Sequence, residues 1–520
     1  MEIKRALISV SDKTGLRELV EVLNKYGVEI MSTGGTAEEI ASYGVTVREV
    51  SSYTDFPEML DGRVKTLHPK IHAGFLALRN NKKHMKCLEE NAIFPIDMLV
   101  VNLYPFEKTI AKPNVSFEEA IENIDIGGPA MMRSAAKNFK SVAVVSSITQ
   151  YGMIIEELEN SDGNINKGIL ENLAKEVFKK TSYYDAIIAD YLAGKRGQEE
   201  NDGFPNIMKM RMNKIKELRY GENPHQKAAF YKDLSSKAQG IADAEQLQGK
   251  ELSFNNILDL SAAYEMVTNF SQPAVSIVKH NNPCGIAVAD NLQKAFIDAV
   301  DCDRLSAFGG IMAFNRSIDG KMAQIILKES DFVECIIASE YDVEAKEIFS
   351  VKKNLRLLKL PLIKSVLKND KDFKKVSGGM LVQDSDVKDT KRADMQVVTE
   401  AQPSEELWNA LMFGWKVVKY VKSNAIVLCK GTKTVGIGAG QMSRVDSVII
   451  AMRKAGARTK EAILASDAFF PKIDSIEEAY KAGIAAIIQP GGSIRDNEVI
   501  DACNKFNLPM VFTGVRHFRH

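Results

Sequence analysis

The chain has little that would mark a secreted, metal-binding or membrane-bound protein. Its six cysteines include no Cys-x-x-Cys pair and stand at positions 87, 284, 302, 335, 429 and 503. This pattern is typical of reduced thiols, and it argues against a disulfide framework or a thiolate zinc site. The apolar part of the N-terminus is too short for a signal peptide, and no apolar run is long enough to span a membrane. We therefore expect a cytoplasmic protein that does not interact with membranes.

An excess of charge of either sign is also lacking. Lys and Arg together number 68, as do Asp and Glu, in a chain of 520 residues. A nucleic-acid-binding protein usually carries a basic stripe, and a balanced chain has no global field that attracts nucleic acid or an anionic membrane. An anionic ligand must therefore be held by local clusters. The length and a hydrophobic fraction of 45% predict two to four globular domains.

The first part of the sequence alternates between strands and helices. Short apolar strands are expected at 6–10, 28–31, 98–103 and 142–145, with helices between them and a further helix at 182–192. This alternation predicts an α/β fold with a parallel sheet covered on both faces. The polar, glycine-bearing residues 193–203 are typical of a linker. We place a boundary near 195–205, which divides the chain into domains 1–198 and 199–520.

The second part carries a weak internal repeat. Residues 274–288 predict a strand, a turn containing Gly285 and a second strand. Residues 425–439, with Gly436 and Gly438, repeat this order, and a helix and an apolar strand follow each copy. Two similar α/β subdomains and two unrelated βαβ units are equally good interpretations of this pattern.

The most informative segment is Lys279–Gly285, with the sequence Lys-His-Asn-Asn-Pro-Cys-Gly. It follows the apolar run 274–278, which is typical of a buried strand, and open α/β sheets bind ligands outside the ends of such strands. A neighbouring ammonium disfavours the protonated form of a histidine, so Lys279 and His280 together suggest a neutral general base. The alternative is a histidine that caps a loop beside a solvated lysine.

Two loops in the first part are candidates for an anion site. Ser9–Gly15 follows the first strand and Ser32–Thr36 follows the second, and each offers hydroxyls, backbone amides and a helix N-terminus. Neither matches the Walker or dinucleotide fingerprints. Each loop alone is typical of a capped helix start, but two such loops on adjacent strands favour a phosphate.

Charged and acid–base side chains follow further predicted strands. The loop Gly62–Pro69 contains Arg63 and Lys65, and Asp125 precedes a Gly-Gly-Pro turn and a helix that carries Lys137. In a nucleotide site, Arg and Lys bind phosphate while Asp and Lys transfer protons. A set of surface ion pairs is the alternative, although it requires neither glycine turns nor strand ends. Other polar or glycine-bearing segments are Leu218–Gln226, Arg304–Gly310, Ser423–Asn424, Gly436–Arg444, Ser466–Pro471 and Thr513–His520.

These strings, in this order, resemble the family of bifunctional enzymes that combine 5-aminoimidazole-4-carboxamide ribonucleotide (AICAR) formyltransferase with IMP cyclohydrolase, over essentially the whole chain. The resemblance implies an N-terminal cyclohydrolase domain similar in fold to methylglyoxal synthase. It also implies a C-terminal formyltransferase part with two subdomains similar to cytidine deaminase but without zinc. The absence of a His-x-Glu before a Pro-Cys-x-x-Cys agrees with this. A homodimer is implied too, because the family's transfer site lies across a dimer interface.

In the N-terminal part, the resemblance implies that Lys65, Tyr104, Asp125 and Lys137 handle protons and stabilise an oxyanion as formyl-AICAR closes to IMP. The residues that it assigns to nucleotide binding are Ser11, Asp12, Lys13, Thr33, Gly34, Gly35, Thr36, Arg63, Val64, Thr66 and Asn102.

In the C-terminal part, it implies that His280 accepts a proton as the AICAR amine attacks the formyl carbon of the cosubstrate 10-formyltetrahydrofolate. Lys279 would assist the departing N10 and Asn424 would bind the tetrahedral oxygen. The residues implied for AICAR are Arg219, Tyr220, Gly309, Glu334, Arg444, Phe469 and Arg516, and those near folate are Asp474, Gln489 and Pro490. Some family members carry Asp where Glu334 stands.

Two rival functions remain from the residues themselves. One is a non-catalytic nucleotide sensor, against which the Lys279–His280 pair and Asn424 argue. The other is a deaminase-like hydrolase, which the missing metal ligands disfavour.

Overall fold

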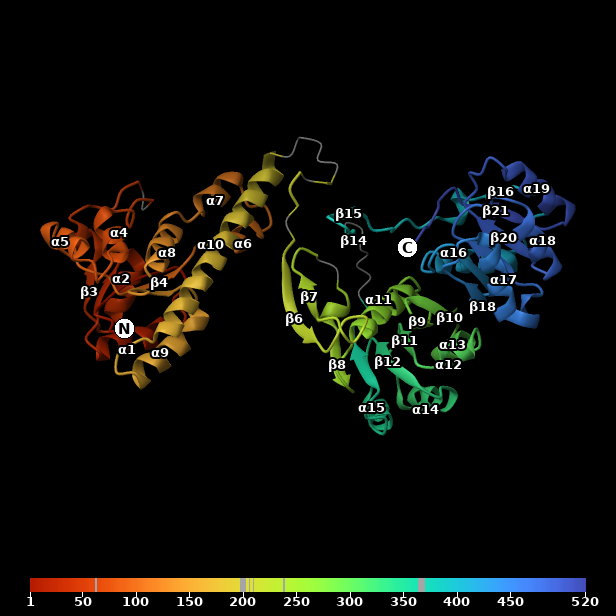
Figure 1. Ribbon diagram of the computed structural model, residues 1–520, viewed down its shortest axis with the longest axis horizontal. Helices are drawn as coiled ribbons and strands as arrows, with labels where there is room; N and C mark the ends of the chain where they lie inside the picture. Colours follow the sequence, from red (N-terminus) through yellow and green to blue (C-terminus); the bar gives the residue numbers. More distant parts are fainter. Residues whose placement is uncertain (61–62, 197–202, 205, 209, 237–238, 363–369) are drawn as a thin grey trace. The chain divides into compact units, whose positions relative to one another are not determined.

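The computed structural model describes residues 1–60, 63–196, 203–204, 206–208, 210–236, 239–362 and 370–520 (Figure 1). It forms two compact units, Met1–Met208 and Lys209–His520. The boundary predicted after residue 198 lies within 197–202, outside the described residues. The helix predicted at 182–192 is part of α10, which spans Lys167–Arg196, so the first residues of the predicted linker are helical instead. Among the described residues, no helix is both long and apolar enough to cross a bilayer.

The first unit contains the predicted parallel sheet. Its strands are β1 (Arg5–Val10), β2 (Glu29–Ser32), β3 (Val47–Glu49), β4 (Met98–Asn102) and β5 (Ala143–Val145), in the order β3-β2-β1-β4-β5, with every pair parallel. Its helices are α1 (Leu16–Lys25), α2 (Gly34–Ser42), α3 (Val50–Thr54), α4 (Pro69–Leu76), α5 (Lys82–Glu90), α6 (Phe106–Ile110), α7 (Phe117–Glu122), α8 (Gly127–Lys137), α9 (Tyr151–Asn160) and α10.

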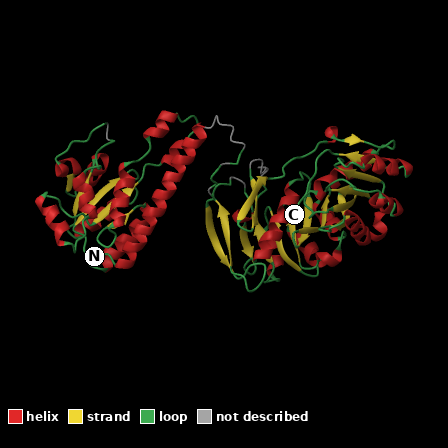
Figure 2. Ribbon diagram, turned by 45° about the horizontal axis from the view of Figure 1, so that its top comes forward, coloured by secondary structure: helices red, strands yellow, loops and turns green. Residues whose placement is uncertain are grey.

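Alternation along β1 divides the core of this unit into two layers. Ala6 and Ile8 face a cluster with α1 and α9, whereas Leu7 faces a cluster with α4, α8 and α10. Both faces are therefore buried, as the near-continuous apolar strands predict (Figure 2). The strand order reverses between β1 and β4, and parallel α/β sheets bind ligands at the carboxyl ends of the strands at such a reversal.

The second unit is built on a twelve-stranded mixed sheet, in the order β16-β21-β20-β19-β17-β18-β10-β9-β11-β12-β13-β8. The elements of its first half are β8 (Glu245–Gln248), α11 (Phe254–Thr268), β9 (Ala274–Lys279), β10 (Asn282–Val288), α12 (Leu292–Val300), α13 (Arg304–Ala307), β11 (Gly310–Phe314), α14 (Gly320–Glu329), β12 (Val333–Ala338), α15 (Val343–Ser350) and β13 (Arg356–Lys359). Those of its second half are β16 (Gln396–Val397), α16 (Glu405–Val418), β17 (Ile426–Lys430), β18 (Lys433–Gly438), α17 (Arg444–Ala455), β19 (Ile463–Ser466), α18 (Asp474–Lys481), β20 (Ala486–Gln489), α19 (Asp496–Lys505) and β21 (Met510–Phe512). Two further two-stranded sheets pair β6 (Met212–Leu218) with β7 (Ala228–Asp233) and β14 (Lys371–Val376) with β15 (Gly379–Asp384).

The topology confirms the internal repeat. In one copy a helix precedes the hairpin β9–β10, β11 lies antiparallel to β9, and β12 and β13 continue in parallel. The other copy repeats this with the hairpin β17–β18 and with β19, β20 and β21. The copies join where β10 pairs antiparallel with β18. Helices α11 and α16 lie in one core layer that both copies share, and the remaining helices form two separate layers.

The glycines of this repeat do not form the turns that the sequence suggested. The hairpin turns are His280–Asn281 and Gly431–Thr432, since Lys279 pairs with Asn282 and Lys430 with Lys433. Gly285, Gly436 and Gly438 lie inside β10 and β18 instead.

These three glycines permit close helix packing. A Cβ atom at Gly285 would lie 2.0 Å from Ala299 O of α12, and one at Gly436 would lie 2.2 Å from Ala451 O of α17. At Gly438 the nearest atom is Ser447 O, at 1.9 Å. The lack of a side chain at each of these three positions is thus explained by a helix that lies against the strand.

We expect Gly285→Ala to lower the free energy of unfolding by about 3 kcal/mol, because α12 must move away from β10 to admit a methyl group. Thermal unfolding of the full chain measures this. Gly240→Ala is the matched control, because Gly240 has no neighbouring heavy atom within 4 Å and its φ is −151°. Equal unfolding temperatures for the two variants would contradict the packing explanation.

Candidate active sites

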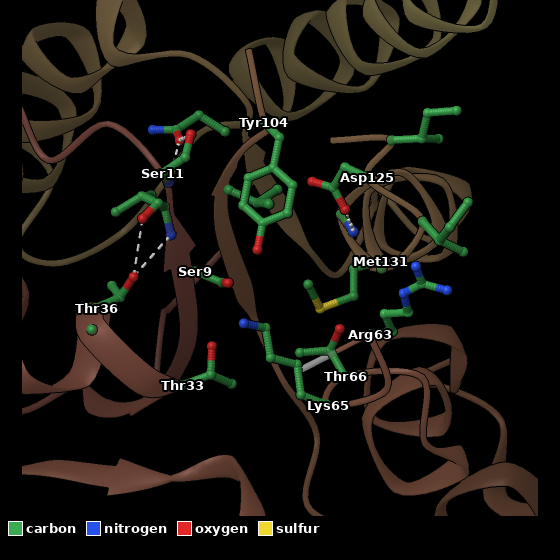
Figure 3. A pocket seen from close by; sticks show the side chains of 18 of the residues that line it. Ser9, Ser11, Thr33, Thr36, Arg63, Lys65, Thr66, Tyr104, Asp125 and Met131 are labelled. Carbon is green, nitrogen blue, oxygen red and sulfur yellow. Dashed lines mark hydrogen bonds between the residues drawn. The ribbon is translucent and has the colours of Figure 1, made fainter. Parts of the chain in front are cut away.

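A cavity of about 600 Å³ opens at the carboxyl ends of β1 and β4, where the strand order reverses. It is the site that the sequence predicts for the first unit. The predicted residues that line it are Ser11, Lys13, Thr33, Gly35, Thr36, Arg63, Lys65, Thr66, Asn102, Tyr104 and Asp125 (Figure 3). Asp12, Gly34, Val64 and Lys137 do not line it.

Asn102 holds the loop that follows β1. Its Oδ1 accepts hydrogen bonds from Ser11 N at 2.6 Å, Ser11 Oγ at 2.7 Å and Asp12 N at 3.0 Å, and its Nδ2 donates to Asp12 O at 2.8 Å. The side chain of Asp12 turns back to accept from Thr14, which holds the pKa of its carboxyl below the usual range. Asn102 therefore shapes the loop from β4 and contributes to the cavity wall mainly in this way.

The two candidate anion loops do not use their hydroxyls as helix caps. Neither Gly15 before α1 nor Thr33 before α2 provides a side-chain cap. The Thr36 hydroxyl instead accepts from Val10 N and donates to Val10 O at the end of β1. Lys13 reaches the cavity beside Glu39, with Nζ 3.6 Å from Oε2. The N-terminus of α2 and Lys13, from the loop after β1, thus line one cavity, which is an arrangement that favours a phosphate.

The opposite wall carries the predicted cations Arg63 and Lys65 and two carboxylates that the sequence analysis does not predict. Arg63 pairs with Glu122 at the end of α7, and this contact holds the pKa of the Glu122 carboxyl below its usual range. Figure 3 shows Lys65 and Tyr104 projecting into the space between the two walls. Glu58 and Glu122 line the cavity, and no local sequence motif predicts this.

Asp125 stands at the start of α8 and is the acid–base group most enclosed by this cavity. Its Oδ1 accepts from Gly128 N at 2.8 Å, and its own backbone N–H donates to Tyr184 Oη of α10 at 2.8 Å. Burial raises the pKa of the Asp125 carboxyl above its usual range, although hydrogen bonds from backbone amides and the charge of Lys65 oppose that rise. A carboxylate with a raised pKa is a stronger base.

Lys137 lies at the other end of α8. The helix has 11 residues, so its C-terminal residue is about 15 Å from the end that meets the cavity. Lys137 is exposed. The role that the resemblance implies for it has no support from a contact within this cavity.

The second predicted site forms around the β9–β10 hairpin. Lys279 ends β9 and donates from Nζ to Phe308 O at 2.8 Å, while His280 is exposed at the turn. Asn282 Oδ1 accepts from Lys422 N at 2.9 Å, which ties the hairpin to the segment that carries Asn424 in the other repeat. The structure thus brings together two motifs that are more than a hundred residues apart.

Asn424 belongs to a buried polar network. Its Oδ1 accepts from Arg444 Nη2 at 2.7 Å, and its Nδ2 donates to Gln441 O and Met442 O. Arg444 also pairs with Asp467, which is fully buried and accepts from the Ser423 hydroxyl. Because each group is satisfied, the amide of Asn424 is held in one orientation.

The other residues predicted for this unit lie on several elements. Glu334 of β12 pairs with Arg356 Nη1 at 2.8 Å and also accepts from Asn256 of α11. Arg219 lies over the ring of Tyr220 after β6, and Gly309 precedes β11 with a φ of 70°. Phe469 and Pro490 follow β19 and β20, Gln489 ends β20, Asp474 begins α18, and Arg516 lies over the ring of Phe518 near the chain end.

The described residues contain no group of three or more His, Cys, Asp or Glu side chains placed to hold a metal ion. All six cysteines are free thiols, and five of them are buried.

The fold and the sites define a class of protein: an enzyme with two α/β units, each of which presents acid–base side chains at strand ends. Residues 15–130 match the MGS-like domain, and residues 135–454 match the AICARFT/IMPCHase bienzyme. The bifunctional purine biosynthesis protein PurH of Magnetococcus marinus is 52% identical over 532 residues, with 100% of both chains covered. The PurH of Acetivibrio thermocellus is 51% identical, also over 100% of both chains. The crystal structure of ForH covers 36% of this chain and 97% of its own, at 30% identity and a TM-score of 0.34.

The chain belongs to the AICARFT/IMPCHase bienzyme family. It is a bifunctional enzyme of purine biosynthesis, with AICAR formyltransferase and IMP cyclohydrolase activities.

Proposed function

We propose that the cavity between β1 and β4 closes formyl-AICAR to IMP, and that Lys279, His280 and Asn424 transfer the formyl group to AICAR from 10-formyltetrahydrofolate. We assign these reactions to residues 1–198 and 199–520. The observation that carries the first assignment is Asp125 beside Lys65 in one cavity, opposite the loop after β1 and the uncapped start of α2. The link from Asn282 to Lys422, which joins the hairpin to the segment of Asn424, carries the second.

In the cyclisation, the carboxamide nitrogen of formyl-AICAR attacks the formyl carbon and water leaves. Asp125 accepts the proton of that nitrogen, because its raised pKa makes it a better base than an exposed aspartate. Lys65 and Tyr104 stabilise the oxygen on which negative charge develops. The loops after β1 and β2 hold the phosphate, with Arg63 opposite. Since the reaction is intramolecular, holding the substrate in its folded conformation supplies much of the rate.

In the transfer, the 5-amine of AICAR attacks the formyl carbon and forms a tetrahedral intermediate. His280 accepts the amine proton, Asn424 binds the tetrahedral oxygen, and Lys279 assists N10 as the bond between carbon and N10 breaks. Tetrahydrofolate and formyl-AICAR leave. Arg444 fixes the orientation of the Asn424 amide by donating to its Oδ1, and one Nδ2–H of Asn424 must leave Gln441 O or Met442 O to bind the tetrahedral oxygen. No step requires a metal.

We also propose that the enzyme is a cytoplasmic homodimer. The sheets β6–β7 and β14–β15 each have only two strands, which are marginal alone, and both expose large apolar side chains such as Ile215, Tyr231 and Leu381. A second copy of the chain would cover them. Buried thiols without disulfides support the assignment to the cytoplasm.

We expect Asp125→Asn to lower the rate of cyclisation by about 10²–10⁴-fold, the usual loss for a general base. In the unchanged enzyme, kcat/KM should fall as the pH falls through the pKa of Asp125, because the protonated carboxyl cannot accept a proton. That decline should begin above the usual pH range of an aspartate, since burial raises this pKa. Asp97→Asn is the control: burial also raises the pKa of Asp97, but Asp97 does not line the cavity. An unchanged acid limb in Asp125→Asn would contradict the assignment.

We expect Lys65→Ala to lower kcat of cyclisation by about 10²-fold, because a fixed ammonium stabilises the developing oxyanion. Arg63→Ala should mainly raise KM, since phosphate is bound equally in the ground and transition states.

The resemblance implies that Lys137→Ala also lowers kcat of cyclisation. A wild-type rate for that variant would remove Lys137 from the catalytic set, in agreement with its place at the far end of α8.

We expect His280→Ala to lower formyl transfer by about 10²–10⁴-fold and to leave cyclisation intact. The assay supplies AICAR and 10-formyltetrahydrofolate and follows both tetrahydrofolate and IMP. Cyclisation of separately supplied formyl-AICAR is the internal control for folding. If the unchanged chain released no tetrahydrofolate, the proposed donor would be wrong, and an equal loss of both activities in His280→Ala would indicate misfolding or a shared site.

A further inference from the structure

The turn that presents His280 has an unusual backbone. Lys279 pairs with Asn282, so the turn has two central residues, His280 with φ 54° and Asn281 with φ 60°. A two-residue turn with both φ angles positive matches the twist of a hairpin, but it is normally formed by Asn-Gly or Asp-Gly. Histidine and asparagine occur in this left-handed region more often than most residues, but each still has a steric cost there that glycine does not have. Something outside the turn must therefore hold it.

One carboxylate provides that support. Asp259 Oδ2 accepts from His280 N at 3.1 Å, and Asp259 Oδ1 accepts from Asn281 N at 2.6 Å. Each carboxylate oxygen of Asp259 thus accepts a hydrogen bond from one of two successive backbone amides. Hydrogen bonds to an ionised acceptor are stronger than those between neutral groups, and two of them fix both the position and the tilt of the turn.

The carboxylate comes from a rigid element. Asp259 stands in the middle of α11, which begins at a capping box on Ser253 and buries Leu260, Ala263 and Met266 completely in the core. One turn earlier on the same face, Asn256 donates to Glu334 Oε2. A single helix therefore sets the His280 turn and also contacts a residue that the family resemblance assigns to AICAR.

We propose that Asp259 is a positioning residue for formyl transfer, which acts by holding the His280–Asn281 turn in the conformation that presents the imidazole. This inference rests on the proposed function of His280. Asp259 itself touches no reacting atom in this proposal. Asp259 affects the position of the His280 imidazole, and a displacement of about 1 Å at a reacting group lowers the rate roughly 10²-fold.

The first test is Asp259→Asn in the full-length enzyme. An asparagine retains one acceptor oxygen and places an NH₂ group opposite the other backbone amide, so the turn loses one of its two supports. We expect kcat of formyl transfer to fall by about 10–100-fold, with KM for AICAR changed by less than about threefold. A wild-type kcat would overturn the proposal.

The matched control is Asp342→Asn. Asp342 also holds two backbone amides with one carboxylate, Ala345 N at 2.7 Å and Gly320 N at 3.3 Å, but it does so at the start of α15. It should lose comparable stability and keep its kcat. If Asp342→Asn lowered kcat as much as Asp259→Asn, the effect would be general destabilisation and the proposal would fail.

Rescue separates positioning from chemistry. Glycine at position 281 adopts a positive φ without strain, so Asn281→Gly should favour the same turn without help from Asp259. We expect the double variant Asp259→Asn/Asn281→Gly to recover most of the lost kcat. No recovery would overturn a role that acts through the turn.

Two further readouts keep the result interpretable. Cyclisation of formyl-AICAR by the same preparations and thermal unfolding report whether each variant is folded. If Asp259→Asn is not folded, Asp259→Glu takes its place. We then expect an intermediate kcat of formyl transfer, and a wild-type kcat would contradict the proposal. His280→Ala is measured in parallel. If it retains formyl transfer, the proposed function of His280 is wrong, whereas a loss in His280→Ala with none in Asp259→Asn refutes only the present inference.

Discussion

The functional loops of this protein depend on one constraint: a backbone amide that leaves a sheet without a ladder partner must find another acceptor. In both units a side chain from a neighbouring element supplies it. Asn102 at the end of β4 accepts from Ser11 N and Asp12 N after β1, and Asp259 of α11 accepts from both amides of the His280–Asn281 turn. Each loop is therefore positioned by an element other than the strand that delivers it. This arrangement lets a loop with no regular structure hold catalytic side chains in a fixed place.

The repeat shows what function adds to this constraint. The equivalent turns are His280–Asn281 in one copy and Gly431–Thr432 in the other. The second turn has a glycine at its positive φ of 54°, and Thr432 joins the copies by donating to Val288 O. The first has no glycine and needs Asp259. Strained backbone tends to gather at functional sites, where surrounding structure maintains it, and of these two equivalent turns only the one with the proposed base places a residue other than glycine at a positive φ.

The sequence predicted the elements well and the turns poorly, for a physical reason. Buried strands such as β4 and β9 are marked by their apolar runs, and the α/β class follows from their alternation with helices. Glycine, however, signals both a turn and a close approach of two backbones, and sequence alone does not separate them. The sequence predicts Gly285 in a turn, whereas in the structure Gly285 lies in a strand and permits α12 to pack closely against it. The actual turn, His280–Asn281, lies before Gly285, at residues other than the glycine that usually follows asparagine in such a turn.

The sites were predictable only as far as their motifs extend. The family motifs predict Lys65, Asp125, Lys279 and His280 as site residues, and the structure places the first two in one cavity, while their catalytic roles stay proposals. The sequence analysis does not predict Glu122, Tyr184 and Asp259, because each contacts its partner from a helix whose sequence carries no functional motif. Such residues act on others rather than on a ligand, so their identity depends on tertiary contacts.

The two proposed bases, Asp125 and His280, have different surroundings. An aspartate is too weak a base unless burial raises its pKa, and Asp125 is accordingly enclosed in a cavity. The proposed base of the transfer site, His280, is instead exposed at its turn. The two residues are held in place by different parts of the structure. Hydrogen bonds with Gly128 N and Tyr184 Oη hold Asp125 at the cavity wall, whereas the exposed His280 depends on a backbone turn that Asp259 holds.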